Sequence, residues 1–198
     1  MKQSFVLLKL LLDHAVEMNL VNRNPIQSGS RSGRSLLPRI EVQRQKRALE
    51  KDELMALANN AGNYTLLILV AGLLGIRWAE LVALTPEDFD FKKKTITVSK
   101  SLSEISGHFE LVTPKSGKVR VLPLLNILER DLKALCLATI EGESIFKSAK
   151  GGYLRHSNFM KRVFSPALAM AIVRQITFHE LRDTAISHAV AFDAVLLV

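Results

Sequence analysis

The hydrophobic positions at the start of the chain recur at helical spacing. Four apolar residues lie three or four positions apart: Phe5, Leu8, Leu12 and Ala15. They share one face of a helix, and the pattern predicts a helix over residues 4–20 that stops before Pro25. A single helix of this length cannot bury its apolar face alone, so it needs a partner or is left over from a larger unit.

From about Arg47 the pattern becomes that of a folded domain. Helices are expected over residues 51–60, 64–74 and 77–84, because apolar residues recur there at helical spacing. Gly75 supplies the usual C-terminal stop for the second of them. The sequence Thr85-Pro86-Glu87-Asp88 carries the cap, proline and acidic residues of a single helical turn.

The period then changes from helix to strand. Residues 95–102, 109–114 and 118–124 alternate as strands. Ser106-Gly107 and Lys115-Ser116-Gly117 fit the two connecting turns, which predicts a three-stranded antiparallel meander.

The remainder returns to helix. Helices are expected over residues 124–138, 157–171 and from His179 onward, with a turn at Gly151-Gly152. The chain is therefore expected to have an α+β fold that is mainly helical.

The composition is basic, which indicates the kind of partner that the chain binds. The formal net charge is +8 with a pI near 9.8, which favours an acidic partner such as nucleic acid. Residues 23–47 hold seven cations against Glu41 alone, so they carry six of the eight net charges. Because residues 25–46 are rich in Ser, Gly and Arg without periodicity, they are expected to form a basic linker.

Three further features indicate a soluble, intracellular, cytoplasmic protein. The single cysteine, Cys136, excludes an internal disulfide and lies in an apolar helix, where burial is expected. The first residues lack a cleavage site for a signal peptide. The apolar run of residues 64–74 is too short to span a bilayer, so no membrane partner is expected.

Candidate chemistry lies at the boundaries between elements. Arg77 follows a helix stop, Lys115 lies in a hairpin, and His179 and Arg182 begin the last helix. Two guanidiniums, an ammonium and an imidazole that converge would bind a phosphodiester and stabilise its transition-state charge. No carboxylate pair or Cys-His cluster accompanies them, so neither a metal nor a cofactor is expected.

Each of these residues also has a plainer interpretation. Arg77 could simply pair with Glu80 one turn on, and Glu80 fits a structural partner better than a base. Lys115 could be a solvated hairpin lysine, and His179 a helix-start histidine. Trp78 is expected in the core. The remaining histidines show no ligand spacing and are assigned no role: His14, His108, His156 and His188.

Three segments resemble the signature boxes of the phage-integrase family of tyrosine recombinases. They are GLLGIRWAELVAL (72–84), TPKSGKVRVLPL (113–124) and FHELRDTAIS (178–187). RALEKDEL (47–54) is similar to the opening of the family's catalytic domain, and residues 145–164 to the segment before the histidine box. The resemblance implies that fold for residues 47–198, after a remnant of the core-binding domain at 1–24 and the linker at 25–46.

In this family a tyrosine attacks a DNA phosphate and forms a 3′-phosphotyrosyl link. Matched by position, Arg77 and Arg182 would hold the non-bridging oxygens, Lys115 would protonate the leaving 5′-oxygen, and His179 would assist proton transfer. The implied partner is double-stranded DNA at an attachment-type site, with no small-molecule substrate. Further DNA contacts are expected from basic residues of the linker and of the helix before the histidine box: Arg31, Arg34, Arg39, Arg44, Arg155, Lys161 and Arg162.

The chain departs from the family after Ile186. The family continues there into a Leu-Gly-His box and then a helix with the nucleophilic tyrosine. The tyrosines here are Tyr64 and Tyr153, and neither matches the position of that nucleophile. Asp183 also replaces a histidine usual after the arginine box. We therefore expect a chain truncated at both ends that binds DNA but does not recombine it alone. The missing helices would leave core exposed, and the apolar tail at 194–198 would either cover part of that core or form an aggregation-prone surface.

Three alternatives remain open. The chain could occupy attachment sites and block an intact integrase, or it could take its tyrosine in trans from an intact integrase protomer. In the third, the three boxes are chance and the chain is an unrelated basic helical regulator. A single cleft shared by Arg77, Lys115, His179 and Arg182 would exclude the third.

Overall fold

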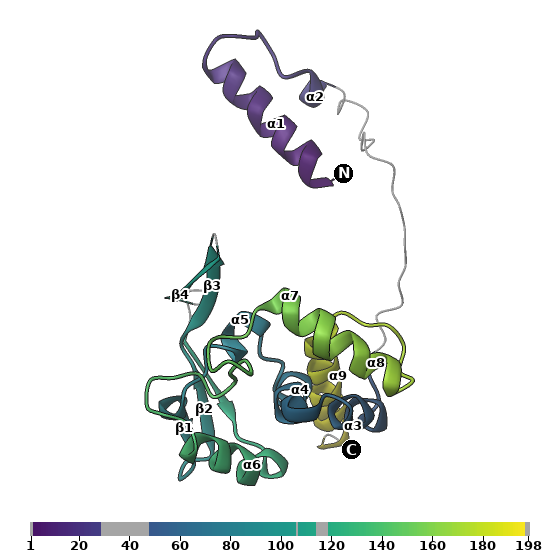
Figure 1. Ribbon diagram of the computed structural model, residues 1–198. Coiled ribbons are helices and arrows are strands. Elements are labelled where there is room, and N and C mark those ends of the chain that lie inside the picture. The colour runs from purple at the N-terminus through teal and green to yellow at the C-terminus, as the bar shows by residue number, and fades with distance from the viewer. Residues whose placement is uncertain (1, 29–47, 106, 114–118, 197–198) are drawn as a thin grey trace. The chain divides into compact units, whose positions relative to one another are not determined.

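The chain forms two compact units, Met1–Gln45 and Lys46–Val198. The computed structural model describes residues 2–28, 48–105, 107–113 and 119–196 (Figure 1). Within these ranges no helix is long and apolar enough to cross a membrane.

Unit 1 contains helix α1 (Lys2–Glu17) and the short helix α2 (Pro25–Ser28). The predicted first helix is confirmed, but it ends three residues earlier than expected, and Pro25 begins a helix because its fixed φ suits a first helical position. Asn24 holds the turn: its side-chain amide donates to Asp13 Oδ1 (2.7 Å), and its oxygen accepts from the Ile26 amide (2.9 Å). Several apolar residues of α1 are at least half exposed: Val6, Leu7, Leu8, Leu10 and Leu11.

Unit 2 begins with helices that fall in the predicted places, apart from η2 (Gly62–Tyr64), which was not predicted. They are α3 (Lys51–Asn59), η2, α4 (Thr65–Leu74), α5 (Trp78–Leu81) and η3 (Pro86–Asp88). The Glu50 amide donates to Glu53 at 2.7 Å and closes a capping box at the start of α3. Gly75 ends α4 with φ +63°, a conformation that favours glycine. Helix α5 is shorter than the predicted 77–84.

The strands pair differently from the predicted meander. Strands β1 (Phe89–Asp90), β2 (Thr95–Val98) and β5 (Arg120–Pro123) form an antiparallel sheet in the order β1-β2-β5. Strands β3 (Ser101–Ile105) and β4 (His108–Val112) form a separate hairpin. The predicted pairing of residues 95–102 with 109–114 is confirmed in part by the β3–β4 hairpin, whereas β1 was not predicted. The predicted place of the last strand beside 109–114 is wrong, because β5 pairs with β2 in the register Thr97↔Val121.

Lys100 explains why the expected strand 95–102 is broken. Its ammonium lies 2.8 Å from Thr85 Oγ1 and 3.0 Å from Asp88 Oδ2, at the capping box of η3. Both partners are buried. The backbone must leave the β2 ladder at Ser99-Lys100 to place this side chain there, so β3 starts a new ribbon, which Figure 1 shows projecting beyond the sheet.

The later helices complete unit 2. They are α6 (Asn126–Leu137), α7 (His156–Phe159), η4 (Met160–Phe164), α8 (Ser165–Met170) and α9 (Glu180–Leu196). The helix predicted over 157–171 is confirmed, with a π-helical stretch at η4. Pro166 gives a reason for it, because proline has no N–H to donate to the preceding turn. The side chains of the expected tail at 194–198 lie outside the described residues.

The core joins helices from both ends of unit 2. Figure 1 shows α3, α4, α8 and α9 grouped beside the sheet and α6. A Cβ at Gly72 would lie 2.5 Å from Leu54 Cδ1, so glycine leaves room for the Leu54 side chain between α3 and α4. Cys136 is buried as expected, and burial, together with the charges of Glu87 and Asp88, raises the pKa of its thiol to about 11.

Candidate functional site

Three of the four predicted site residues line one cleft. It has a volume of about 210 Å³ and is formed by the boundaries of α5, α7 and α9: Ile76, Arg77, Trp78, His156, Phe178, His179 and Arg182. The fourth, Lys115, lies outside the described residues. Arg77 and Arg182 are 105 positions apart in sequence (182 − 77), so the fold has brought them together.

An aromatic cluster beneath the cleft holds its two sides. Trp78 follows Arg77 and Phe178 precedes His179, and their rings meet edge to face with centroids 5.1 Å apart. Phe159, which is 2% exposed, lies 4.8 Å from Trp78 and 5.9 Å from Phe178. Trp78 is half-buried, so it packs on the core, as expected, and also faces the cleft.

Arg77 both pairs with Glu80 and faces the cleft. It caps the N-terminus of α5, where its amide donates to Glu80 Oε2 (3.0 Å) and its Nη1 to Glu80 Oε1 (3.1 Å). Its side chain is still 42% exposed. The pairing interpretation is therefore correct, and it does not exclude a second contact by the same guanidinium.

Glu80 is the buried counter-charge of the site, with 2% exposure. Arg120, from β5, donates to it through Nη1 (2.9 Å) and Nη2 (2.6 Å). Burial alone would raise the pKa of the Glu80 carboxyl, but hydrogen bonds from Arg120 and the Arg77 amide, with the charge of Arg120, hold the pKa below its ordinary value. Glu80 is therefore ionised and structural.

Arg182 lies on α9 and is held by the end of α4. Its Nη1 donates to the Gly75 carbonyl at 2.9 Å. A Cβ at Gly75 would lie 3.2 Å from the Ala185 Cβ, so glycine also permits this approach of α9. Partial burial lowers the pKa of Arg182, as do the charges of Arg77 and Arg120. Arg77 and Arg120 thus share the Glu80 carboxylate, and Arg182 brings a third guanidinium close enough for their charges to act on it.

Two histidines complete the cleft. His179 is exposed, and its carbonyl accepts from the Arg182 amide at 3.0 Å at the start of α9. His156, the first residue of α7, lies 5.2 Å from the Trp78 ring, and burial lowers the pKa of its imidazole. Sequence reasoning assigned His156 no role, since only the packing of α7 on α5 brings it to the cleft.

The other predicted basic residues fall into three groups. Four lie outside the described residues: Arg31, Arg34, Arg39 and Arg44. Lys161 and Arg162 are exposed on η4. Arg155 is engaged within the protein, because it pairs with Glu104, donates to the Gly107 carbonyl (2.8 Å) and lies 5.2 Å from the Phe109 ring.

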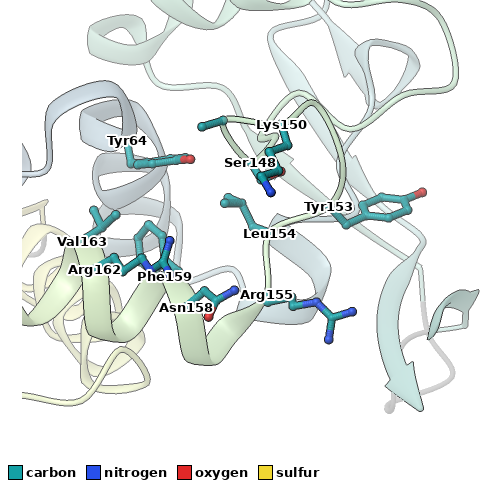
Figure 2. A pocket seen from close by; sticks show the side chains of 11 residues that line it. Tyr64, Ser148, Lys150, Tyr153, Leu154, Arg155, Asn158, Phe159, Arg162 and Val163 are labelled. Carbon is teal, nitrogen blue, oxygen red and sulfur yellow. The ribbon is translucent and has the colours of Figure 1, made fainter. Parts of the chain in front are cut away.

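A second, larger pocket of about 540 Å³ lies on the other side of α7. In Figure 2, Lys150 and Ser148 stand on a loop across from the helix that carries Asn158 and Arg162. Both tyrosines line this pocket rather than the cleft of Arg77. The Tyr64 hydroxyl donates to the Lys147 carbonyl (3.2 Å), and the Tyr153 ring lies 5.4 Å from Phe109.

No group of three or more potential metal ligands occurs among the residues that the structure describes. Within the cleft, the side chains that can act are two guanidiniums and two imidazoles. Such a set binds an oxyanion through charge-assisted hydrogen bonds.

Comparisons with known proteins identify the family of the chain. The sequence pattern of the Phage integrase family matches residues 47–191. The integrase of Staphylococcus phage L54a is 30% identical over 152 residues, which cover 66% of this chain and 43% of that protein. The chain thus spans less than half the length of this relative.

Solved structures share the fold. The Tn1549 transposon integrase, in complex with a circular intermediate DNA, matches 92% of this chain and 64% of its own with a TM-score of 0.73 and 19% identity. The XerA recombinase matches 72% of this chain and 50% of its own, with a TM-score of 0.55 and 20% identity. The boxes are therefore not chance: the chain belongs to the phage integrase family, and its second unit has the fold of a tyrosine-recombinase catalytic domain.

Proposed function

We propose that this chain binds double-stranded DNA and holds one phosphodiester in the cleft of Arg77, His179 and Arg182. The observation that supports this most is the charge of the cleft: the described residues that line it include two guanidiniums and two imidazoles, an excess of positive charge, and no carboxylate. An anion is the natural complement of such an excess. The Tn1549 integrase, which shares the fold, was solved in complex with DNA.

The proposed roles follow from the chemistry of each group. Arg77 and Arg182 hold the non-bridging phosphate oxygens, since a planar guanidinium can donate two parallel hydrogen bonds. His179 shares a proton with the reacting oxygens, and Lys115 protonates the leaving 5′-oxygen. His156, whose pKa is lowered by burial, is a neutral donor or acceptor at the same phosphate.

Contacts beyond the cleft extend along the DNA backbone. Lys161 and Arg162 are exposed on η4, next to the helix start that lines the cleft. The linker cations Arg31, Arg34, Arg39 and Arg44 add a second contact region. Arg155, held by the β3–β4 hairpin, contributes through the position of that hairpin. Such contacts carry little sequence information, so they confer affinity rather than choice of an attachment-type site.

Salt dependence of DNA affinity tests this function. In fluorescence anisotropy with a labelled duplex, log affinity should fall linearly with log salt, with a slope of about 0.9 per phosphate contact. Arg77→Gln and Arg182→Gln should each weaken binding roughly 10- to 100-fold and reduce the slope by about 1. Arg130→Gln is the matched control, because Arg130 on α6 is 92% exposed and pairs with its neighbour Asp131. An affinity that is independent of salt would refute DNA binding by this cleft.

We also propose that residues 1–198 do not cleave DNA unaided. Tyr64 and Tyr153 are the tyrosines of the chain, and neither is among the residues that line the cleft. A duplex with a nick beside the scissile phosphate traps covalent intermediates, so denaturing gels should show no adduct with this chain alone. An adduct that disappears in Tyr64→Phe or Tyr153→Phe would overturn the proposal.

The same assay separates the two partner hypotheses. An intact integrase with its own catalytic arginines replaced is mixed with this chain on the nicked duplex. An adduct on the integrase would mean that the integrase supplies its tyrosine in trans. If wild-type integrase is instead inhibited in proportion to DNA affinity, and Lys115→Ala inhibits equally, the chain acts by occupying the site.

A further inference from the structure

We propose that Arg120 is a positioning residue that orients Arg77 through the carboxylate they share. This inference rests on the proposed function, because the orientation concerns the phosphate that Arg77 binds. Arg120 was assigned no role from the sequence, and the cleft itself does not include it.

The geometry of Glu80 carries the inference. Its Oε1 accepts from both Arg77 Nη1 (3.1 Å) and Arg120 Nη1 (2.9 Å), and its Oε2 accepts from the Arg77 amide (3.0 Å) and Arg120 Nη2 (2.6 Å). Each oxygen thus joins one group of Arg77 to one group of Arg120. With 2% of Glu80 exposed, water has little access to replace either partner.

The two arginines use their donor groups differently. Arg120 commits both Nη atoms to Glu80 in the two-pronged geometry that a carboxylate favours. Arg77 gives the Glu80 side chain Nη1, so its Nη2 and Nε keep hydrogen atoms to donate toward the cleft. Arg120 therefore fixes the carboxylate, and the carboxylate fixes the rotation of the Arg77 guanidinium.

Strand β5 turns Arg120 inward against its apolar neighbours. Val119 and Val121 are 63% and 61% exposed, whereas the Arg120 side chain is 28% exposed. Alternation along a strand would ordinarily bury the valines. Arg120 instead faces inward together with Leu122, which packs against the core, and the ion pair with Glu80 offsets the cost of partly burying its charge.

The carboxylate shared by Arg77 and Arg120 also bears on Lys115, the residue proposed as general acid. Lys115 lies in the segment between β4, which ends at Val112, and β5, which begins at Arg120. Because Arg120 is tied to the same carboxylate as Arg77, one end of that segment is fixed relative to the cleft.

A double-mutant cycle on DNA affinity tests the inference. Arg120→Gln should weaken duplex binding roughly ten-fold in the wild-type background and less than about two-fold in Arg77→Gln, because Arg77 transmits its effect. Arg120→Lys keeps the charge and loses the two-pronged geometry, so it should weaken binding nearly as much as Arg120→Gln. Arg130→Gln serves as the control that changes the charge alone.

The possible outcomes separate the inference from the proposed function. If Arg77→Gln itself leaves affinity and salt slope unchanged, the proposed function fails. Suppose instead that Arg77→Gln weakens binding, but the factors by which Arg77→Gln and Arg120→Gln reduce affinity simply multiply, or Arg120→Lys binds like wild type. The proposed function then stands, and the positioning role of Arg120 is wrong.

Folding of the variants is checked by thermal melts. Should Arg120→Gln fail to fold, the double variant Glu80→Gln with Arg120→Gln replaces the ion pair with two amides that can bond to each other. Its affinity should remain reduced, and the Arg77 Nε–H signal in ¹⁵N spectra should move from its wild-type position. An unchanged signal would overturn the inference.

Discussion

Replacement of Phe159 by alanine should lower the free energy of unfolding by about 3–5 kcal/mol, the range for a large aromatic removed from a packed core. Phe159 is 2% exposed, and its ring lies within 6.5 Å of four others: Tyr64, Trp78, Phe164 and Phe178. Trp78 and Phe178 are the neighbours of Arg77 and His179, so the cavity should also loosen the cleft. Urea denaturation measures the first effect, and duplex affinity the second.

Phe109→Ala is the matched control for this substitution. Phe109 is half-buried on β4, where it contacts Tyr153 and Arg155. The same truncation there should cost less than half as much, because less apolar surface is buried. Equal losses at the two positions would show that the aromatic cluster is not the centre of the core.

Replacement of Glu80 by alanine should lower the free energy of unfolding by roughly 2–4 kcal/mol, because it leaves guanidiniums together without their counter-charge. This loss is smaller than that for a fully buried ion pair, because the Arg77 and Arg120 side chains are 42% and 28% exposed and remain partly hydrated. Glu110→Ala, on the exposed face of β4, should change stability by less than about 0.5 kcal/mol. A loss at Glu80 no larger than that at Glu110 would contradict the account of the ion pair.

The effect of Glu80 should depend on pH in a definite direction. Its pKa in the folded protein lies below the ordinary value of 4.5, so its ionised form is favoured by folding. The contribution of Glu80 to the free energy of unfolding is complete above about pH 4.5 and is lost as the pH falls through the lowered pKa. The stability difference between wild type and Glu80→Gln should therefore be constant near neutrality and shrink in acid. A difference that grew in acid would show that the pKa is raised instead.

Local signals in the sequence predicted most of the helices and the cleft. Gly75 marks the end of α4 by its own chemistry, and α3 follows from the helical spacing of its apolar residues, so both fall almost where expected. Arg77, His179 and Arg182 were found because each adjoins such a boundary within a family box. Glu80 as a structural partner also follows from its spacing to Arg77 on one helix face.

What the sequence did not predict depends on contacts between distant residues. The break at Lys100 arises from its partners at Thr85 and Asp88, and hydrophobic alternation runs straight through it. Arg120 lies in a strand whose valines would be expected to point inward, but Arg120 and Leu122 face inward instead, and Arg120 pairs with Glu80. Neither ion pair has a local signature, because each joins residues that are distant in the sequence.

The hydrogen bonds of Leu49 have a consequence for how the protein is made. Its amide donates to Thr184 Oγ1 (3.1 Å) across 135 residues, and its carbonyl lies 2.9 Å from His188 Nε2 across 139. Both partners are on α9, so these two hydrogen bonds cannot form until nearly all of unit 2 has left the ribosome. Contacts of such sequence separation slow folding and leave earlier helices uncovered during synthesis. Arg182 lies on the same helix, so the cleft of Arg77, His179 and Arg182 is complete only after α9 has packed.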